Sequence, residues 1–171
     1  MKKAKGLSER IEALAGRIPG LGTYRDRERR RDTDKLLRDY LSKLMLESKA
    51  QLQDFSLDLI KHGKLEPMDD LDRLASHIQQ ISDTIKHAGY GYSGIFDVEK
   101  IGGEELDRLY EFDLSLVDDI DKLTNTIKLL KSDISSNEIS VFCVRLEDVE
   151  ELLFSFERKF GERSNHMAQT A

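Results

Sequence analysis

Four segments of this chain repeat apolar residues at intervals of three and four, and this periodicity constrains the fold more than any other feature. Such intervals place one apolar seam along an α-helix. A helix with a single narrow seam is not stable alone, so the seams must bury one another. We therefore predict an all-α fold, an antiparallel bundle of four main helices, long and coiled-coil-like. The seams are Leu37, Leu41, Leu44, Ser48, Leu52, Phe55 and Leu59; Leu71, Leu74, Ile78, Ile81, Ile85 and Ala88; Leu106, Leu109, Asp113, Val117, Ile120, Leu123, Ile127, Leu130 and Ile134; and Ile139, Phe142, Leu146, Val149, Leu153, Phe156 and Phe160.

Glycine and proline predict where the first two bundle helices meet. The first helix is expected to run over residues 24–62 and to stop at Gly63. Pro67 suits the first turn of the next helix, and Asp69 is a candidate cap for it.

Serine and glycine signals bound the last helix. Ser135 or Ser136 is predicted to cap it, and Ser135 with Glu138 forms a capping-box pattern. Gly161 is expected to end it. The predicted organisation is an N-terminal amphipathic helix over 1–18, a bundle domain over 19–161 and a disordered tail over 162–171.

Charge and cysteine content narrow the class of protein. The 171 residues suit one domain, and 35% of them are charged. The first 35 residues carry a local net charge of +5 and the remainder −11. A single cysteine allows no disulfide framework, and no apolar stretch approaches the about 20 residues that span a bilayer. We expect a cytoplasmic protein, with attachment to the inner face of the membrane left open.

Residues 90–97 read Y-G-Y-S-G-I-F-D and are the best functional lead in the chain. With Gly89 they match G-x-G-x-x-G, but no strand precedes the motif and no βαβ unit surrounds it, so a nucleotide site is disfavoured. Two interpretations stay open. In the first, Tyr90, Tyr92, Ile95 and Phe96 pack as a plug at the bundle end; in the second, the partly exposed tyrosines form a partner-binding hot spot.

A second unusual segment, residues 24–35, contains many arginines and no aliphatic residue. Its acidic residues are interleaved with the arginines, so Arg30 and Asp34 can pair along an exposed helix, and nucleic-acid binding is disfavoured. Arginine can still bind carboxylates of a protein partner. If residues 24–35 overhang the bundle, they would lie beside residues 90–97. The predicted partner-binding residues are Tyr24, Arg25, Arg29, Tyr90, Tyr92 and Phe96.

The predicted N-terminal helix is basic and amphipathic. It either packs on the bundle or lies on an anionic membrane surface. The residues assigned to membrane contact in the second case are Lys2, Lys3, Leu7, Ile11 and Leu14.

Metal and catalytic chemistry find little support in the sequence. No Glu-x-x-His pair occurs, so a di-iron bundle site is not expected. The acidic run Asp118, Asp119 and Asp121 is predicted to be a solvated face. Asp113 falls within an apolar seam, where it is expected to pair with a tyrosine or arginine across the interface. Cys143 is expected to be an inert, half-buried thiol. We predict no catalytic residue, metal or cofactor.

The motif I-P-G-L-G-T-Y-R-D-R-E-R-R-R-D, together with Y-G-Y-S-G-I-F-D and L-D-R-L-Y-E-F-D-L, resembles a family of bacterial cytosolic helical proteins. Members are often encoded beside membrane-scaffold proteins of the stomatin/flotillin (SPFH) type, and the family has no assigned activity. The resemblance covers roughly residues 18–130. It implies an adaptor for membrane-associated assemblies. We accordingly expect a non-enzymatic interaction or scaffold protein, with self-association open and peripheral membrane binding as the alternative.

Overall fold

The fold was analysed in a computed structural model that describes residues 2–18, 20, 30–88, 103–135 and 138–169. Side chains are not described at residues 2–8, 30–33, 103–107, 109 and 164–169. These residues contain five α-helices: α1 (Lys2–Arg17), α2 (Arg30–Lys61), α3 (Met68–His87), α4 (Gly103–Ser135) and α5 (Ile139–Gln169).

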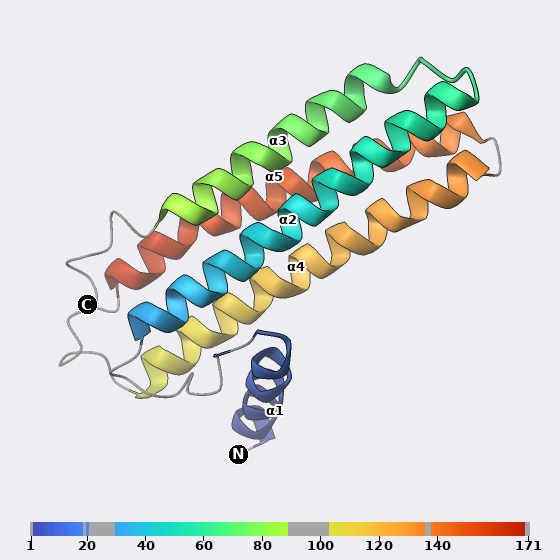
Figure 1. Ribbon diagram of the computed structural model, residues 1–171. Helices are drawn as coiled ribbons and strands as arrows, with labels where there is room; N and C mark the ends of the chain where they lie inside the picture. The colour runs from blue at the N-terminus through green and yellow to red at the C-terminus, as the bar shows by residue number, and fades with distance from the viewer. Residues whose placement is uncertain (1, 19, 21–29, 89–102, 136–137, 170–171) are drawn as a thin grey trace.

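Helices α2 to α5 form a long four-helix bundle, as predicted (Figure 1). The antiparallel pairs α2/α3 and α4/α5 make the most extensive contacts, and they stack so that α2 packs on α4 and α3 on α5. Both hairpins turn at one end of the bundle, which we call the turn end. Helices α2 and α4 begin, and α3 and α5 end, at the opposite end (Figure 1). The stacked neighbours therefore run parallel, an arrangement that the apolar periodicity does not determine.

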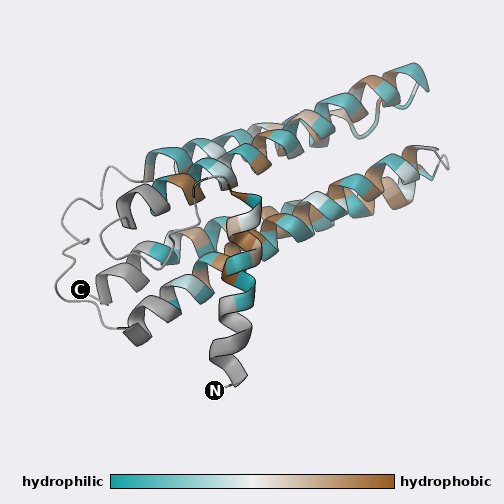
Figure 2. Ribbon diagram, turned by 60° about the horizontal axis from the view of Figure 1, so that its bottom comes forward, coloured by the Kyte–Doolittle hydropathy of each residue, from teal (hydrophilic) through white to brown (hydrophobic). Residues whose placement is uncertain are grey.

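One continuous apolar core runs between the four helices. All the predicted seam residues of α3 from Leu71 to Ile85 are buried, as are those of α5 from Phe142 to Phe160. In α2 the buried position next to Leu41 is Met45 rather than the predicted Leu44, which is half-buried. Apolar residues recur among hydrophilic ones along each bundle helix (Figure 2). The predicted periodicity therefore identified the buried side of each helix.

The connection between α2 and α3 confirms the predicted stop at Gly63. Gly63 has φ of +67°, which glycine adopts without steric cost. The amide of Gly63 donates to the carbonyl of Ile60 at 3.0 Å, and that of Lys64 donates to Leu59 at 2.9 Å. These two bonds form a Schellman motif, which satisfies carbonyls at the end of the helix.

The predicted caps at Asp69 and Ser135 were wrong. Pro67, not Asp69, occupies the N-cap position of α3 and makes no side-chain capping bond, while Asp69 lies inside the first turn. A carboxylate there still favours the helix through the macrodipole. Ser135 is the last residue of α4, and its hydroxyl donates to the Lys131 carbonyl at 2.9 Å. It therefore forms no capping box with Glu138; Ser136 lies outside the described residues.

Helix α5 does not end at Gly161 but continues to Gln169. The extension carries the buried Arg163 into the bundle end. Gly161 has no positive φ, so it behaves as an ordinary helical residue. The predicted tail over 162–171 is thus helical as far as residue 169. The expected start of α2 at residue 24 lies outside the described residues, within which α2 begins at Arg30.

Candidate functional site

The six predicted partner-binding residues, Tyr24, Arg25, Arg29, Tyr90, Tyr92 and Phe96, all lie outside the described residues. Their roles, and the expected neighbourhood of the two segments that contain them, stay predictions. The described residues that adjoin these two segments lie where α2 begins and α3 ends, at the end of the bundle opposite the turn end (Figure 1).

A buried network of two arginines and two aspartates crosses this end of the bundle. We call Asp34 and Arg38 of α2, Asp113 of α4 and Arg163 of α5 the Arg–Asp network. Arg163 donates from Nε to Asp113 Oδ1 at 2.8 Å and from Nη2 to Oδ2 at 3.2 Å. Its Nη1 lies 2.7 Å from Asp34 Oδ1, as an ion pair rather than an aligned hydrogen bond. Arg38 Nε donates to the other oxygen of Asp34 at 2.8 Å.

The network also reaches the fourth bundle helix. Arg38 Nη1 donates to the carbonyl oxygen of Lys86, near the end of α3, at 3.0 Å. Carbonyls in the last turn of a helix carry a partial negative charge and lack helical partners, so a guanidinium is favourable there. The four side chains therefore connect α2, α3, α4 and α5 at one level of the bundle.

Arg163 is the most deeply buried charge in this group, with only 2% of its surface exposed. Burial by itself lowers the pKa of a guanidinium, but the charges of Asp113 and Asp34 outweigh that effect, so the pKa of Arg163 is raised. Two positive and two negative charges leave the network neutral. Removing one member of a buried pair leaves an uncompensated charge, so the loss of any one of these side chains is expected to lower the free energy of unfolding by about 3–5 kcal/mol.

The network confirms one sequence prediction and overturns another. Asp113 does pair with an arginine across the helix interface, as its position in the seam suggested. Asp34 was expected on a solvated helix face, paired with Arg30; instead it is buried and bound by Arg38 and Arg163. Arg163 was missed because it was assigned to the tail, although it lies three residues after Phe160 and so continues the α5 seam.

The acidic run on α4 is not simply a solvated face, because charged partners bind it. Asp118 accepts from Arg10 of α1 at 2.5 Å, and Asp121 accepts two bonds from Arg17 at 2.7 and 2.8 Å. Asp119 instead accepts from Lys159 of α5 at 2.5 Å. The run therefore attaches α1 and α5 to α4.

Helix α1 packs on the bundle at its C-terminal half, as the first of the two alternatives predicted. Ile11, Leu14 and Ile18 are buried within the common core. The Arg17 guanidinium also lies 5.6 Å from the centre of the Tyr40 ring. Helix α1 lies across the bundle rather than along it, and its N-terminal end points away (Figures 1 and 2). Side chains of Lys2, Lys3 and Leu7 are not described, so their part in membrane contact stays a prediction.

The energetics of this α1 docking contact divide unequally between apolar and charged groups. Burying an aliphatic side chain contributes about 1.5–3 kcal/mol before ordering costs are subtracted. The ion pairs are about half exposed, and such pairs contribute about 0.2–1 kcal/mol each. The hydrogen bonds from Arg17 to Asp121 raise the pKa of Arg17, so this group stays charged at any accessible pH. Apolar contacts therefore supply most of the docking energy, and the ion pairs add an increment that salt can remove.

A second apolar stripe lies on the outward side of α2 and was missed by the sequence analysis. Its large members are Leu46, Leu57 and Ile60, which are 41%, 58% and 51% exposed. With the exposed Ala50 and Gln53 they recur at intervals of 4, 3, 4 and 3. We call these five positions the α2 stripe. A second heptad in the same segment was the signal that could have revealed it.

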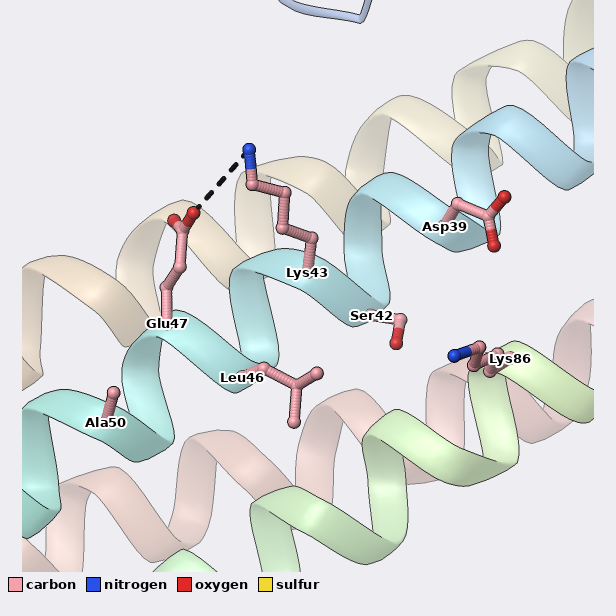
Figure 3. A pocket seen from close by; sticks show the side chains of 7 residues that line it. All are labelled: Asp39, Ser42, Lys43, Leu46, Glu47, Ala50 and Lys86. Carbon is pink, nitrogen blue, oxygen red and sulfur yellow. Dashed lines mark ion pairs between the residues drawn. The ribbon is translucent and has the colours of Figure 1, made fainter.

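An open groove of about 550 Å³ adjoins the N-terminal part of the α2 stripe, at Leu46 and Ala50. Figure 3 shows Leu46 extending between α2 and α3, with Lys86 on the α3 side. The charged lining is balanced, because Asp39 and Glu47 are matched by Lys43 and Lys86, and Lys43 pairs with Glu47 at 3.7 Å. A balanced, shallow lining provides no concentrated charge for an anionic metabolite, but it suits the side of a helix.

Metal-ligating and thiol groups can be located among the described residues. Among them, no cluster of three or more His, Cys, Asp or Glu side chains could hold a metal ion. Cys143 is half-buried, as predicted, and burial raises the pKa of its thiol, which lowers the fraction of reactive thiolate. His77 contacts Glu157 at 3.1 Å on the surface between α3 and α5.

Two further observations concern membrane-spanning helices and relatives of this chain. In the part of the chain that the structure describes, no helix has both the length and the apolar content needed to cross a bilayer. Comparison with protein-family models, with curated proteins and with solved structures found no match to this chain.

Proposed function

We propose that this protein is a non-enzymatic helical scaffold and that a partner helix packs along the α2 stripe. The observation that carries the proposal is the position of the stripe. It runs along α2 on the side away from the core, so the helix has one seam for its own bundle and one for another helix.

The size of the stripe indicates the strength of binding it can provide. Leu46, Leu57 and Ile60 are only about half exposed, so burying the rest of their surface would yield roughly 2–5 kcal/mol in gross terms. Association costs of about 4–15 kcal/mol must be subtracted from this. The stripe alone therefore supports a transient contact, and stable assembly needs a further contact. Leu65 in the α2–α3 turn, 63% exposed, extends the apolar surface at the turn end.

The resemblance to bacterial adaptor-like proteins supports the same class of function, an interaction protein for membrane-associated assemblies. The alternative function, peripheral membrane binding through the N-terminal helix, requires a change in the position of α1. Ile11 and Leu14 are buried against the bundle, so α1 must leave α4 before these residues can reach lipid.

A site-specific photo-crosslinker tests the scaffold proposal. It is placed at Leu57 in one variant and at Leu129, a leucine of α4 with similar exposure, in a matched control. We expect a discrete adduct from position 57 in the native cell, and its loss when Leu46→Gln is added. The adduct, identified by mass spectrometry, would be either a second copy of this chain or another helical protein. Equal adducts from both positions, or none from position 57, would remove the α2 stripe as the interface.

A further inference from the structure

The α1 docking contact uses the same side chains that a basic amphipathic helix needs to bind a membrane. Arg10 and Arg17 bind carboxylates of α4, and Ile11, Leu14 and Ile18 are buried beneath them. In the sequence, Leu7 precedes Ile11 by four positions, and Lys2, Lys3 and Lys5 precede Leu7. No other described helix carries three basic residues and no acidic residue in its first seven positions.

The attachment of α1 to α4 depends in part on ion pairs, so nearby charges and salt can change its strength. The Arg10–Asp118 and Arg17–Asp121 pairs are about half exposed on both sides, so water and salt reach them. An anionic headgroup presents to arginine the same kind of bidentate oxygen acceptor as a carboxylate. The aliphatic residues of α1 can likewise exchange one apolar environment for another.

We propose that α1 is a membrane-binding arm that Asp118 and Asp121 hold against α4, and that an anionic lipid surface competes with these carboxylates for Arg10 and Arg17. In the docked state the arm is withheld. A sufficiently anionic surface releases it, and the apolar stripe of α1 then enters the interface. The α2 stripe takes no part, so this inference is independent of the proposed scaffold function.

Vesicle flotation with the full-length chain tests the competition. The vesicles are phosphatidylcholine alone, or phosphatidylcholine and phosphatidylglycerol in equal parts. The variant Asp118→Asn/Asp121→Asn removes the carboxylates that hold α1. The matched control Asp54→Asn/Asp72→Asn removes the same charge from exposed positions of α2 and α3. We expect the first variant to bind anionic vesicles roughly 2- to 30-fold more tightly than the control, the range given by two exposed ion pairs.

Two further variants separate competition from simple release or unfolding. Arg10→Gln/Arg17→Gln also breaks the ion pairs, but it removes the groups that would bind lipid, so it should bind anionic vesicles more weakly than wild type. Adding Ile11→Asp/Leu14→Asp to the Asp118→Asn/Asp121→Asn variant should abolish binding. Both residues are buried in the core, so the urea midpoint should fall, but circular dichroism in the absence of urea should keep the helical signal of the folded bundle. A Leu46→Gln/Leu57→Gln variant should float as wild type does.

The proposal fails if the Asp118→Asn/Asp121→Asn variant and its matched control float equally. It also fails if Arg10→Gln/Arg17→Gln binds as well as wild type. Equal capture of the protein by a DNA duplex at the same salt concentration would point to a nucleic-acid ligand and overturn the lipid assignment. Loss of photo-crosslinking at position 57 with lipid competition intact would instead overturn only the scaffold function.

Discussion

Replacing Arg163 by methionine is the most informative perturbation of the bundle. The substitution keeps an unbranched side chain but leaves Asp34, Arg38 and Asp113 with one uncompensated negative charge in a buried site. Breaking a buried ion pair in this way costs about 3–5 kcal/mol. For a chain of this length, that corresponds to a fall in Tm of roughly 6–20 °C. Urea unfolding followed by circular dichroism measures the change in free energy directly.

The charge balance of the network makes a sharper prediction for a double variant. Arg163→Met/Asp113→Leu removes one charge of each sign and leaves the neutral Asp34–Arg38 pair, which is joined at 2.8 Å. It should therefore be more stable than Arg163→Met alone, although it carries one more substitution. Arg158→Met, at an exposed position of the same helix, should change stability by less than about 0.5 kcal/mol. If the double variant is less stable than Arg163→Met, neutrality is not what the network provides and the reasoning is refuted.

Three further predictions follow from other positions. Gly161→Ala should raise the free energy of unfolding by about 0.5–1 kcal/mol, since Gly161 is helical and a Cβ there meets no other atom. Gly63→Ala should lower it, because Gly63 has a positive φ. The urea midpoints of the two variants should therefore move in opposite directions. Phe156→Ala should cost about 3–5 kcal/mol and Phe154→Ala far less, because the first ring is buried and the second is 55% exposed; similar losses of Tm would contradict the described core. Burial, assisted by the charges of Glu66 and Asp70, raises the pKa of Cys143. Iodoacetamide should therefore react more slowly with the native chain than with the urea-unfolded chain as the pH approaches 9.0, and equal rates would refute this. The free energy of unfolding should also decline slightly as the thiol of the unfolded chain ionises.

The sequence determined the helices and their buried sides because both follow from local periodicity. Leu71 to Ile85 illustrate this, since every predicted seam residue in that span is buried. The stop at Gly63 was also predictable, because a Schellman motif depends on a few neighbouring residues. Gly161 shows the limit of that rule. A glycine can also be carried inside a helix when tertiary contacts beyond it, here those of Arg163, hold the chain in place.

Contacts between distant segments could not be predicted from one sequence. The pairing of Arg10 and Arg17 with Asp118 and Asp121 depends on where α1 lies across the bundle, and nothing local specifies that placement. Asp113 was the exception, since a carboxylate in an apolar seam requires a partner. The six residues chosen as the partner surface in the aromatic and arginine-rich segments lie outside the described residues, so their role stays a prediction.

The Arg–Asp network also has a consequence for the kinetics of unfolding. Each hairpin is closed by a short turn, whereas Arg163 and Asp113 are 50 positions apart in the chain, and Asp34 is farther still from Arg163. The Arg163–Asp34 contact joins the two hairpins and can form only after they dock, and the Arg163–Asp113 contact closes the end of the α4/α5 hairpin farthest from its turn. Both contacts therefore form late, because their loop-closure entropy is lost last. Arg163→Met should therefore accelerate unfolding in stopped-flow experiments and leave the refolding rate nearly unchanged. The network would then set how long the native bundle persists rather than how quickly it forms.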